Sequence, residues 1–167
     1  LRRHDAIDEA DYTQMQELGR DGGLSEAARR WYETTANRHA AGAGTRGADT
    51  SAGDGLPTSP ALDQILTVAM RPFLSRCAEV MQQRSALAAW SHPHCALCGA
   101  EPDFAVITPA AERHLICGRC TLQWKFEPLT CPFCLNRDRS RITSFATPDG
   151  RYRVYACDVS QRYLKAY

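Results

Sequence analysis

Hydrophobic and polar positions along the chain follow two different periods, helical in the first half and strand-like in the second. Through residues 1–40, apolar residues recur every three to four positions, and the pair Gly22-Gly23 interrupts the pattern. Two amphipathic helices are therefore expected there, and Ser25 has a side chain suited to capping the second of them.

A third and longer helix is expected to begin at Ser59, whose hydroxyl is a suitable N-cap, with Pro60 in the first turn. Apolar residues follow at spacings of three and four as far as Met81. Pro72 lies inside this stretch, and because proline lacks a backbone N–H it is expected to kink the helix or divide it. Cys77 lies on the apolar stripe and is interpreted as a small buried hydrophobic residue.

Residues 41–58 separate the second helix from the third and consist almost entirely of small and polar residues. Such a composition has almost nothing to bury, so the segment has no means to offset the entropy of becoming ordered. It is predicted to be a flexible linker within a helical domain of residues 1–90.

After Trp90 the pattern changes to short β-like runs separated by turn residues. The run Thr-Pro-Asp-Gly at 147–150 has the composition of a hairpin turn. The chain is therefore predicted to be α+β, with a helical N-terminal part followed by small β modules. Strands are expected in two groups, residues 104–108, 113–117 and 121–126 in the first, and residues 142–146 and 151–156 in the second.

Composition narrows the class of protein. The chain is 44% hydrophobic and 23% charged, as in a soluble globular protein, and no apolar run approaches the roughly 18 residues that cross a bilayer. A formal charge of +1 argues against a strongly electrostatic nucleic-acid binder, which is usually far more basic. Arginines crowd the last thirty residues, and they are interpreted as one solvated face of a small sheet.

Eight cysteines are present, and seven of them have spacings typical of metal ligands. Two cysteines close in sequence are poorly placed for ordinary cross-links but present two thiolates to one ion. Because no secretory signal is recognisable, a reducing cytoplasm and metal binding are favoured over a disulfide scaffold. The seven are the CxxC pairs Cys95 and Cys98, Cys117 and Cys120, and Cys131 and Cys134, followed by Cys157.

The first two CxxC pairs are predicted to form one metal site. Eighteen residues separate Cys98 from Cys117, which is room for two strands and a turn that bring the second pair beside the first. Gly99 and Gly118 are expected to supply the positive φ that turns backbone N–H groups toward thiolates. A unit of about 40 residues has too little core to fold unaided, so the metal is expected to stabilise it.

The second site is predicted to contain Cys131, Cys134 and Cys157, with Ser160 at the position of a fourth ligand. A neutral hydroxyl is a poorer ligand than a thiolate. Three readings stay open: three sulfurs plus water, three sulfurs plus Asp158, or no ion. An open fourth position is also typical of catalytic zinc, but no histidine or glutamate general base accompanies the motif, so an enzyme is disfavoured.

Histidines and aromatic residues near the motifs have simpler interpretations. His92 and His94 flank the first CxxC pair and are substitute ligands or, more often for such residues, loop residues. Trp124 and Tyr155 are expected to pack in the small cores rather than to stack on bases. Thiol-redox chemistry is disfavoured because no thioredoxin-like βαβ pattern accompanies the CxxC motifs.

Three ordered segments carry a resemblance to a known family. Residues 69–102 contain Arg-Pro-Phe-Leu and, after Trp90, a Cys-x-x-Cys-Gly-x-x-Pro run; residues 114–134 contain two CxxC pairs with a tryptophan between them; residues 154–167 end in Tyr-Leu-Lys-Ala-Tyr. Together, from about residue 60 to residue 167, the sequence resembles the formate dehydrogenase accessory proteins, the FdhE family.

The resemblance implies a helical part followed by two tandem rubredoxin-like or zinc-ribbon-like modules, here residues 91–128 and 129–167. It implies a cytoplasmic, non-enzymatic maturation factor that binds the catalytic subunit of a formate dehydrogenase, with two zinc or iron ions. Ser160 departs from the family cysteine, which leaves the second ion open. Family members continue past the equivalent of residue 165, so the second module is expected to be truncated.

Alternatives from other classes are a zinc-ribbon nucleic-acid-binding module that uses the C-terminal arginines, and a thiol-redox or metal enzyme centred on the three-cysteine site. Both depend on local features, whereas the resemblance extends over some hundred residues, so the accessory function is favoured. No membrane insertion is expected, and a homodimer is left open as an alternative to a monomer.

Overall fold

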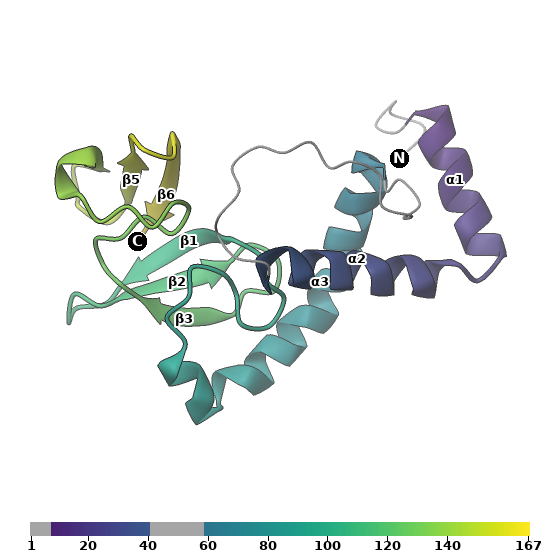
Figure 1. Cartoon of the computed structure of the whole chain (residues 1–167), viewed down its shortest axis with the longest axis horizontal. Helices are drawn as coiled ribbons and strands as arrows, with labels where there is room; N and C mark the ends of the chain where they lie inside the picture. Colours follow the sequence, from purple (N-terminus) through teal and green to yellow (C-terminus); the bar gives the residue numbers. More distant parts are fainter. Residues whose placement is uncertain (1–7, 41–58) are drawn as a thin grey trace. The chain divides into compact units, whose positions relative to one another are not determined.

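The computed structural model describes residues 8–40 and 59–167 (Figure 1). The predicted linker at 41–58 lies outside the described residues. Two compact units are present, Leu1–Pro72 and Phe73–Tyr167, and each is described by itself. The helices are α1 (Glu9–Arg20), α2 (Leu24–Ala40) and α3 (Pro60–Gln82), and short 3-10 helices follow at Ser85–Ala89 and Arg139–Arg141. None of the described helices combines the length and the apolar character needed to cross a membrane.

The first unit is built from the three predicted helices. Asp8 caps α1, since its Oδ1 accepts the N–H of Asp11 at 2.8 Å. Trp31 of α2 is 4% exposed, and its Nε1 donates to Oδ1 of Asp63 in α3 at 2.8 Å. An indole that is buried with its N–H satisfied connects α2 to α3 at little polar cost.

The long helix α3 begins where predicted, because the Ser59 hydroxyl accepts the N–H of Leu62 at 3.2 Å. The helix is continuous through Pro72, so the alternative that proline divides it is wrong, although the boundary between the two units falls directly after that residue. The predicted burial of Cys77 is also wrong, because its side chain is exposed. The buried residues in this part of α3 are Leu74 and Ala78, so the packed face is narrower than the predicted apolar stripe and leaves Cys77 outside it.

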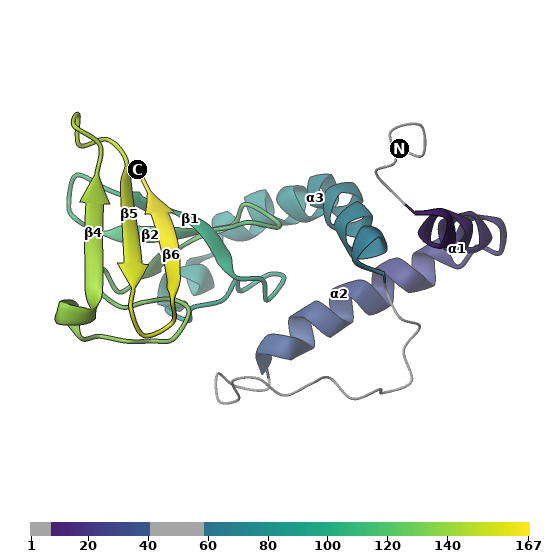
Figure 2. The same ribbon diagram turned by 90° about the horizontal axis from the view of Figure 1, so that it is seen from above.

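Six strands form one sheet in the order β3-β2-β1-β6-β5-β4. Five of them match predicted strands, and β6 is a strand that the sequence pattern did not predict. Its backbone pairs in parallel with β1, and the N–H of Ile107 donates to the carbonyl of Tyr167 at 2.8 Å. This pairing joins the two β modules into a single sheet, and Figure 2 shows β4, β5 and β6 side by side. The strands are β1 (Pro102–Ile107), β2 (Arg113–Cys117), β3 (Gln123–Phe126), β4 (Ile142–Ala146), β5 (Arg153–Cys157) and β6 (Arg162–Ala166).

One face of the sheet is the core of the second unit. Registered residues place Ala105, Leu115 and Trp124 on this face, and all three are at most 1% exposed. The parallel pairing continues the same face to β6, where Leu164 is 2% exposed. The burial of Trp124 confirms its predicted packing role. The α+β class, with helices followed by two small β modules, is therefore confirmed, and the predicted boundaries at 90/91 and 128/129 stay predictions.

The opposite face carries exposed aromatic side chains, which we call the outer aromatic face: Phe145, Tyr152, Tyr163 and Tyr167, between 53% and 60% exposed. Phe145 pairs with Val154, and Tyr163 with Ala156, so their side chains lie on the same side of the sheet. The rings of Tyr152 and Tyr167 are 5.5 Å apart. The predicted hairpin turn at 147–150 joins β4 to β5, and Gly150 has a φ of 68°.

Truncating Leu164 tests how much the joined sheet depends on β6. Leu164→Ala is expected to lower the free energy of unfolding by about 2–5 kcal/mol, because the cavity left in a buried site collapses only in part. The neighbouring Tyr163→Ala, on the exposed face, is expected to cost about 0.5 kcal/mol or less. Urea denaturation of both variants under reducing conditions measures the difference, and equal losses would contradict the assignment of faces.

Candidate metal centres

Four of the predicted cysteines meet at the ends of the first three strands, and we call them the first cluster: Cys95, Cys98, Cys117 and Cys120. Their side chains are between 0% and 3% exposed. The Sγ atoms of Cys95 and Cys120 are 3.4 Å apart, and those of Cys98 and Cys117 are 3.5 Å apart. The thiols come from two turns that the β1–β2 hairpin brings together, as the spacing in the sequence indicated.

The separations between sulfurs fit a tetrahedral metal ion. With metal–sulfur bonds of about 2.3 Å, sulfurs at the corners of a tetrahedron lie about 3.8 Å apart. The observed distances of 3.4 and 3.5 Å, with 3.7 Å between Cys98 and Cys120, are slightly contracted from that arrangement. The first cluster therefore has the geometry and the donor atoms to hold one ion with only small movements.

The four thiols do not ionise independently. Hydrogen bonds from the other three thiols lower the pKa of Cys117 far below that of an ordinary thiol. Donation to Cys117 correspondingly raises the pKa of Cys95 and of Cys120. Protein groups alone thus favour the protonated form of Cys95 and Cys120, and a cation is the means by which all four thiols lose their protons together.

The remaining three predicted cysteines form the second cluster, Cys131, Cys134 and Cys157. The Sγ atoms of Cys134 and Cys157 are 3.7 Å apart, and the Oγ of Ser160 is 3.6 Å from the Sγ of Cys131. Cys134 and Ser160 are half-buried, so this cluster is less enclosed than the first. Although burial opposes its ionisation, hydrogen bonds from Ser160 hold the pKa of Cys157 at about 7.

All four turns that carry these residues have the same backbone geometry. In each, the residue four positions after the first cysteine donates its N–H to that cysteine's carbonyl at 2.9 to 3.1 Å. That residue has a φ between 55° and 67° in every case. The four residues are Gly99, Thr121, Leu135 and Gln161. Positive φ costs an L-residue energy, and three of the four turns accept that cost at a residue other than glycine.

Positive φ was predicted at two glycines, and the structure has it at one of them. Gly99 has the predicted positive φ, but Gly118 does not. Gly118 is needed for a different reason, because a Cβ atom there would lie 2.9 Å from the Cβ of Asp103. Among the residues that the structure describes, His92 and His94 belong to neither cluster. Their carbonyls instead accept the indole N–H groups of Trp124 and Trp90 at 2.8 and 2.9 Å.

The fold has a counterpart among solved structures. The FdhE protein from Pseudomonas aeruginosa matches with a TM-score of 0.51 and 22% sequence identity. The fold is FdhE-like. The match covers 64% of this chain and 39% of that protein, so the chain spans about two fifths of its length. No family model and no curated protein matches the sequence.

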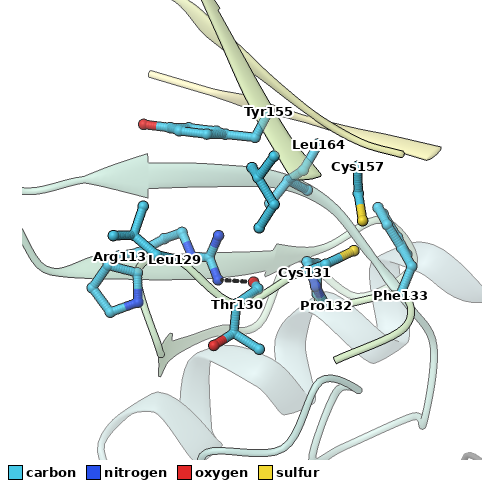
Figure 3. A pocket seen from close by; sticks show the side chains of 11 residues that line it. Arg113, Leu129, Thr130, Cys131, Pro132, Phe133, Tyr155, Cys157 and Leu164 are labelled. Atoms are coloured by element: carbon cyan, nitrogen blue, oxygen red, sulfur yellow. Dashed lines mark hydrogen bonds between the residues drawn. The ribbon is translucent and has the colours of Figure 1, made fainter. Parts of the chain in front are cut away.

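Sequence reasoning missed one charged residue of the FdhE-like fold, Arg113. Its side chain is 3% exposed on the inner face, and its guanidinium donates to the carbonyl of Glu127 and to that of Thr130, the second of which Figure 3 shows. Both carbonyls belong to the segment that leads to Cys131, so Arg113 of the first module holds the start of the second cluster. Burial lowers the pKa of Arg113 to about 10, which leaves it charged at neutral pH. The alternation of Arg113 with Leu115 in a strand is the signal that would have indicated its burial.

Replacing a positive-φ residue by glycine tests whether its backbone conformation is strained. Leu135 is 44% exposed and has a φ of 59°, so Leu135→Gly is expected to stabilise the chain by about 0.5–1 kcal/mol. The control Arg137→Gly, at an exposed residue without positive φ, is expected to destabilise it by a similar amount through the entropy of the unfolded chain. Chemical denaturation measures both, and destabilisation by Leu135→Gly would show that the side chain matters more than the backbone strain.

Proposed function

We propose that this chain is a metal-binding accessory factor that binds the catalytic subunit of a formate dehydrogenase and is needed for the activity of that enzyme. The observation that carries the proposal is the first cluster, four buried thiols at separations that fit one tetrahedral ion. The FdhE-like fold supports the accessory role. Zinc and iron both suit four thiolates, and each cluster is proposed to hold one such ion in the cytoplasm, where thiols stay reduced.

A structural role for the ions, rather than a catalytic one, agrees with the donor sets. In the first cluster, four protein ligands fill the coordination of a tetrahedral ion and leave no position for substrate. Both groups of potential ligands found in the described residues consist of cysteines alone, without a histidine or carboxylate to act as a general base. We therefore infer that the chain carries out no bond-making chemistry of its own.

The outer aromatic face is the surface that we assign to the client subunit. Its four aromatic side chains are more than half exposed, and exposed tyrosines are the residues that contribute most often to protein interfaces. A sheet held by buried metal centres presents them on a rigid support. The ions then contribute to client binding indirectly, by keeping β5 and β6 folded.

A nucleic acid is the second candidate partner for the same face. Lys165 is exposed on this face between Tyr163 and Tyr167, and tyrosines with a neighbouring basic residue also suit single-stranded nucleic acid. The net charge of only +1 disfavours this alternative.

Removing one ligand tests the metal centre. Cys98→Ser is expected to lose one ion per chain and to unfold the first module, because structural metal contributes a large part of the stability of such small units. The control is Cys77→Ser, an exposed cysteine outside both clusters, which is expected to keep the full metal content. Elemental analysis of protein purified without oxygen gives the result, and wild-type protein that contains no metal would overturn the proposal.

Metal affinity is expected to fall with falling pH. Binding requires thiolates, so protons compete with the ion below the thiol pKa, and affinity drops by about one decade per pH unit for each proton released. Competition with a chelator between pH 6 and 8 measures this slope, after correction for protonation of the chelator. A flat profile would show that the bound ion is not held by thiolates.

Client binding is tested with the full chain and the purified catalytic subunit. Tyr163→Ala combined with Phe145→Ala is expected to weaken binding at least about tenfold while metal content stays unchanged, as for residues at the centre of an interface. Undiminished binding after both clusters are disrupted would contradict the proposal.

The salt dependence of binding distinguishes between the two candidate partners. Contacts with phosphates release counterions, so binding of a single-stranded oligonucleotide would fall steeply with salt, by roughly a factor of ten or more between 50 and 200 mM. The client complex, with its aromatic contacts, is expected to change little over that range. Tight oligonucleotide binding with the steep slope, and no binding of the subunit, would favour the alternative.

A further inference from the structure

We propose that the hydroxyl of Ser160 is the fourth ligand of the second centre, which makes that centre a three-sulfur, one-oxygen site. The inference rests on the proposed binding of metal by the two clusters. It assigns different properties to two centres that share one turn geometry.

The turn that carries Ser160 is folded as a ligand turn. The N–H of Gln161 donates to the carbonyl of Cys157 at 2.9 Å, and Gln161 has a φ of 55°. The corresponding bond in the first cluster joins Thr121 to Cys117 at 3.1 Å, with a φ of 65°. Gln161 thus has the same left-handed backbone as Thr121 in the first cluster, although residues other than glycine rarely adopt it.

The distances between equivalent pairs of donor atoms are similar in the two clusters. In the first cluster the outer pair, Cys95 and Cys120, has its sulfurs 3.4 Å apart. In the second cluster the equivalent pair is Cys131 and Ser160, and their Sγ and Oγ atoms are 3.6 Å apart. The inner pairs are 3.5 Å apart in the first cluster and 3.7 Å apart in the second. The Oγ of Ser160 therefore stands where the sulfur of Cys120 stands in the first cluster.

Neighbouring side chains offer no better fourth donor. Asp158 is exposed and is not part of the three-cysteine group, and its backbone N–H donates to the carbonyl of Arg141 at 3.0 Å. Asn136 lies close to the group, but its Nδ2 donates toward the Sγ of Cys157 at 3.9 Å, as a neighbour of the ligands and not as a ligand.

The exchange of sulfur for oxygen changes the chemistry of the centre. Four thiolates around a divalent ion carry a net charge of −2, whereas three thiolates and a neutral hydroxyl carry −1. A hydroxyl is also a weaker donor to zinc or ferrous iron than a thiolate. Because Ser160 and Cys134 are half-buried, solvent and competing ligands reach this side of the centre. The first centre is thus a permanent structural ion, and the second is an exchangeable one that responds to metal supply.

The test is stepwise loss of Co²⁺ from the full chain to a chelator, followed by its visible absorption, for wild type, Ser160→Ala, Ser160→Cys and the control Ser144→Ala on the exposed strand β4. Wild-type protein is expected to release one ion at least about tenfold faster than the other. Ser160→Ala should weaken the faster site at least about tenfold more, since loss even of a group that only supports a ligand costs 10–100-fold. Ser160→Cys should slow that release and increase thiolate-to-cobalt absorption, and Ser144→Ala should change nothing.

Other outcomes overturn the inference in distinguishable ways. An unchanged second site in Ser160→Ala would show that water, not the hydroxyl, completes the centre. Two ions released at one rate in the wild type would show that the centres are equivalent. A single tight ion in every variant would refute the second centre alone, whereas no bound cobalt in any of them would refute the proposed metal binding as well.

Discussion

The second unit has too small an apolar core to be stable by hydrophobic burial alone, and the two thiol clusters supply the missing stability. Each β module contributes only a few fully buried side chains, among them Trp124 and Leu115 in the first module and Leu164 in the second. Units this small do not offset the entropy of folding with hydrophobic burial alone. The cysteines occupy the ends of the strands, where a larger domain would extend its core. The turns accept positive φ at non-glycine residues for the same reason, because placing four donors around one point fixes the backbone more strongly than local preference does.

Pairing between β1 and β6 allows the two modules to support each other. It joins all six strands in one sheet and carries Leu164 and Ala166 onto the buried face. Side chains reinforce the same junction, since Arg162 donates two hydrogen bonds of 2.7 Å to Glu101 and lies over the ring of Phe133 at 3.7 Å. Glu101 follows the first CxxC pair and Phe133 lies inside the third. Buried Arg113 adds a second connection, because it donates to the carbonyl of Thr130, the residue before Cys131.

The sequence predicted the parts of the structure that local pattern determines. Helical periodicity and the Ser59 cap located α3, and the CxxC spacing identified which cysteines come together. Three features depended on distant partners and were missed or wrong. Strand β6 forms because β1, some sixty residues earlier, offers its free edge. Arg113 is buried because carbonyls of a later segment receive its guanidinium. Cys77 is exposed because the packed stripe of α3, which contains Leu74 and Ala78, is narrower than the 3–4 spacing indicated.

The two clusters have different donor atoms at the fourth position but share the same turn geometry. A second module that had lost its need for an ion would be free to relax the turn at Gln161, and the hydroxyl of Ser160 would then have no reason to face Cys131. Both features are present, at distances close to those in the first cluster. The module that carries the weaker donor set is also the one that presents Tyr152, Tyr163 and Tyr167 to solvent. If the second centre holds the ion proposed for it, loss of that ion would loosen the outer aromatic face before it affected the first module, and so would weaken the proposed contact with a client.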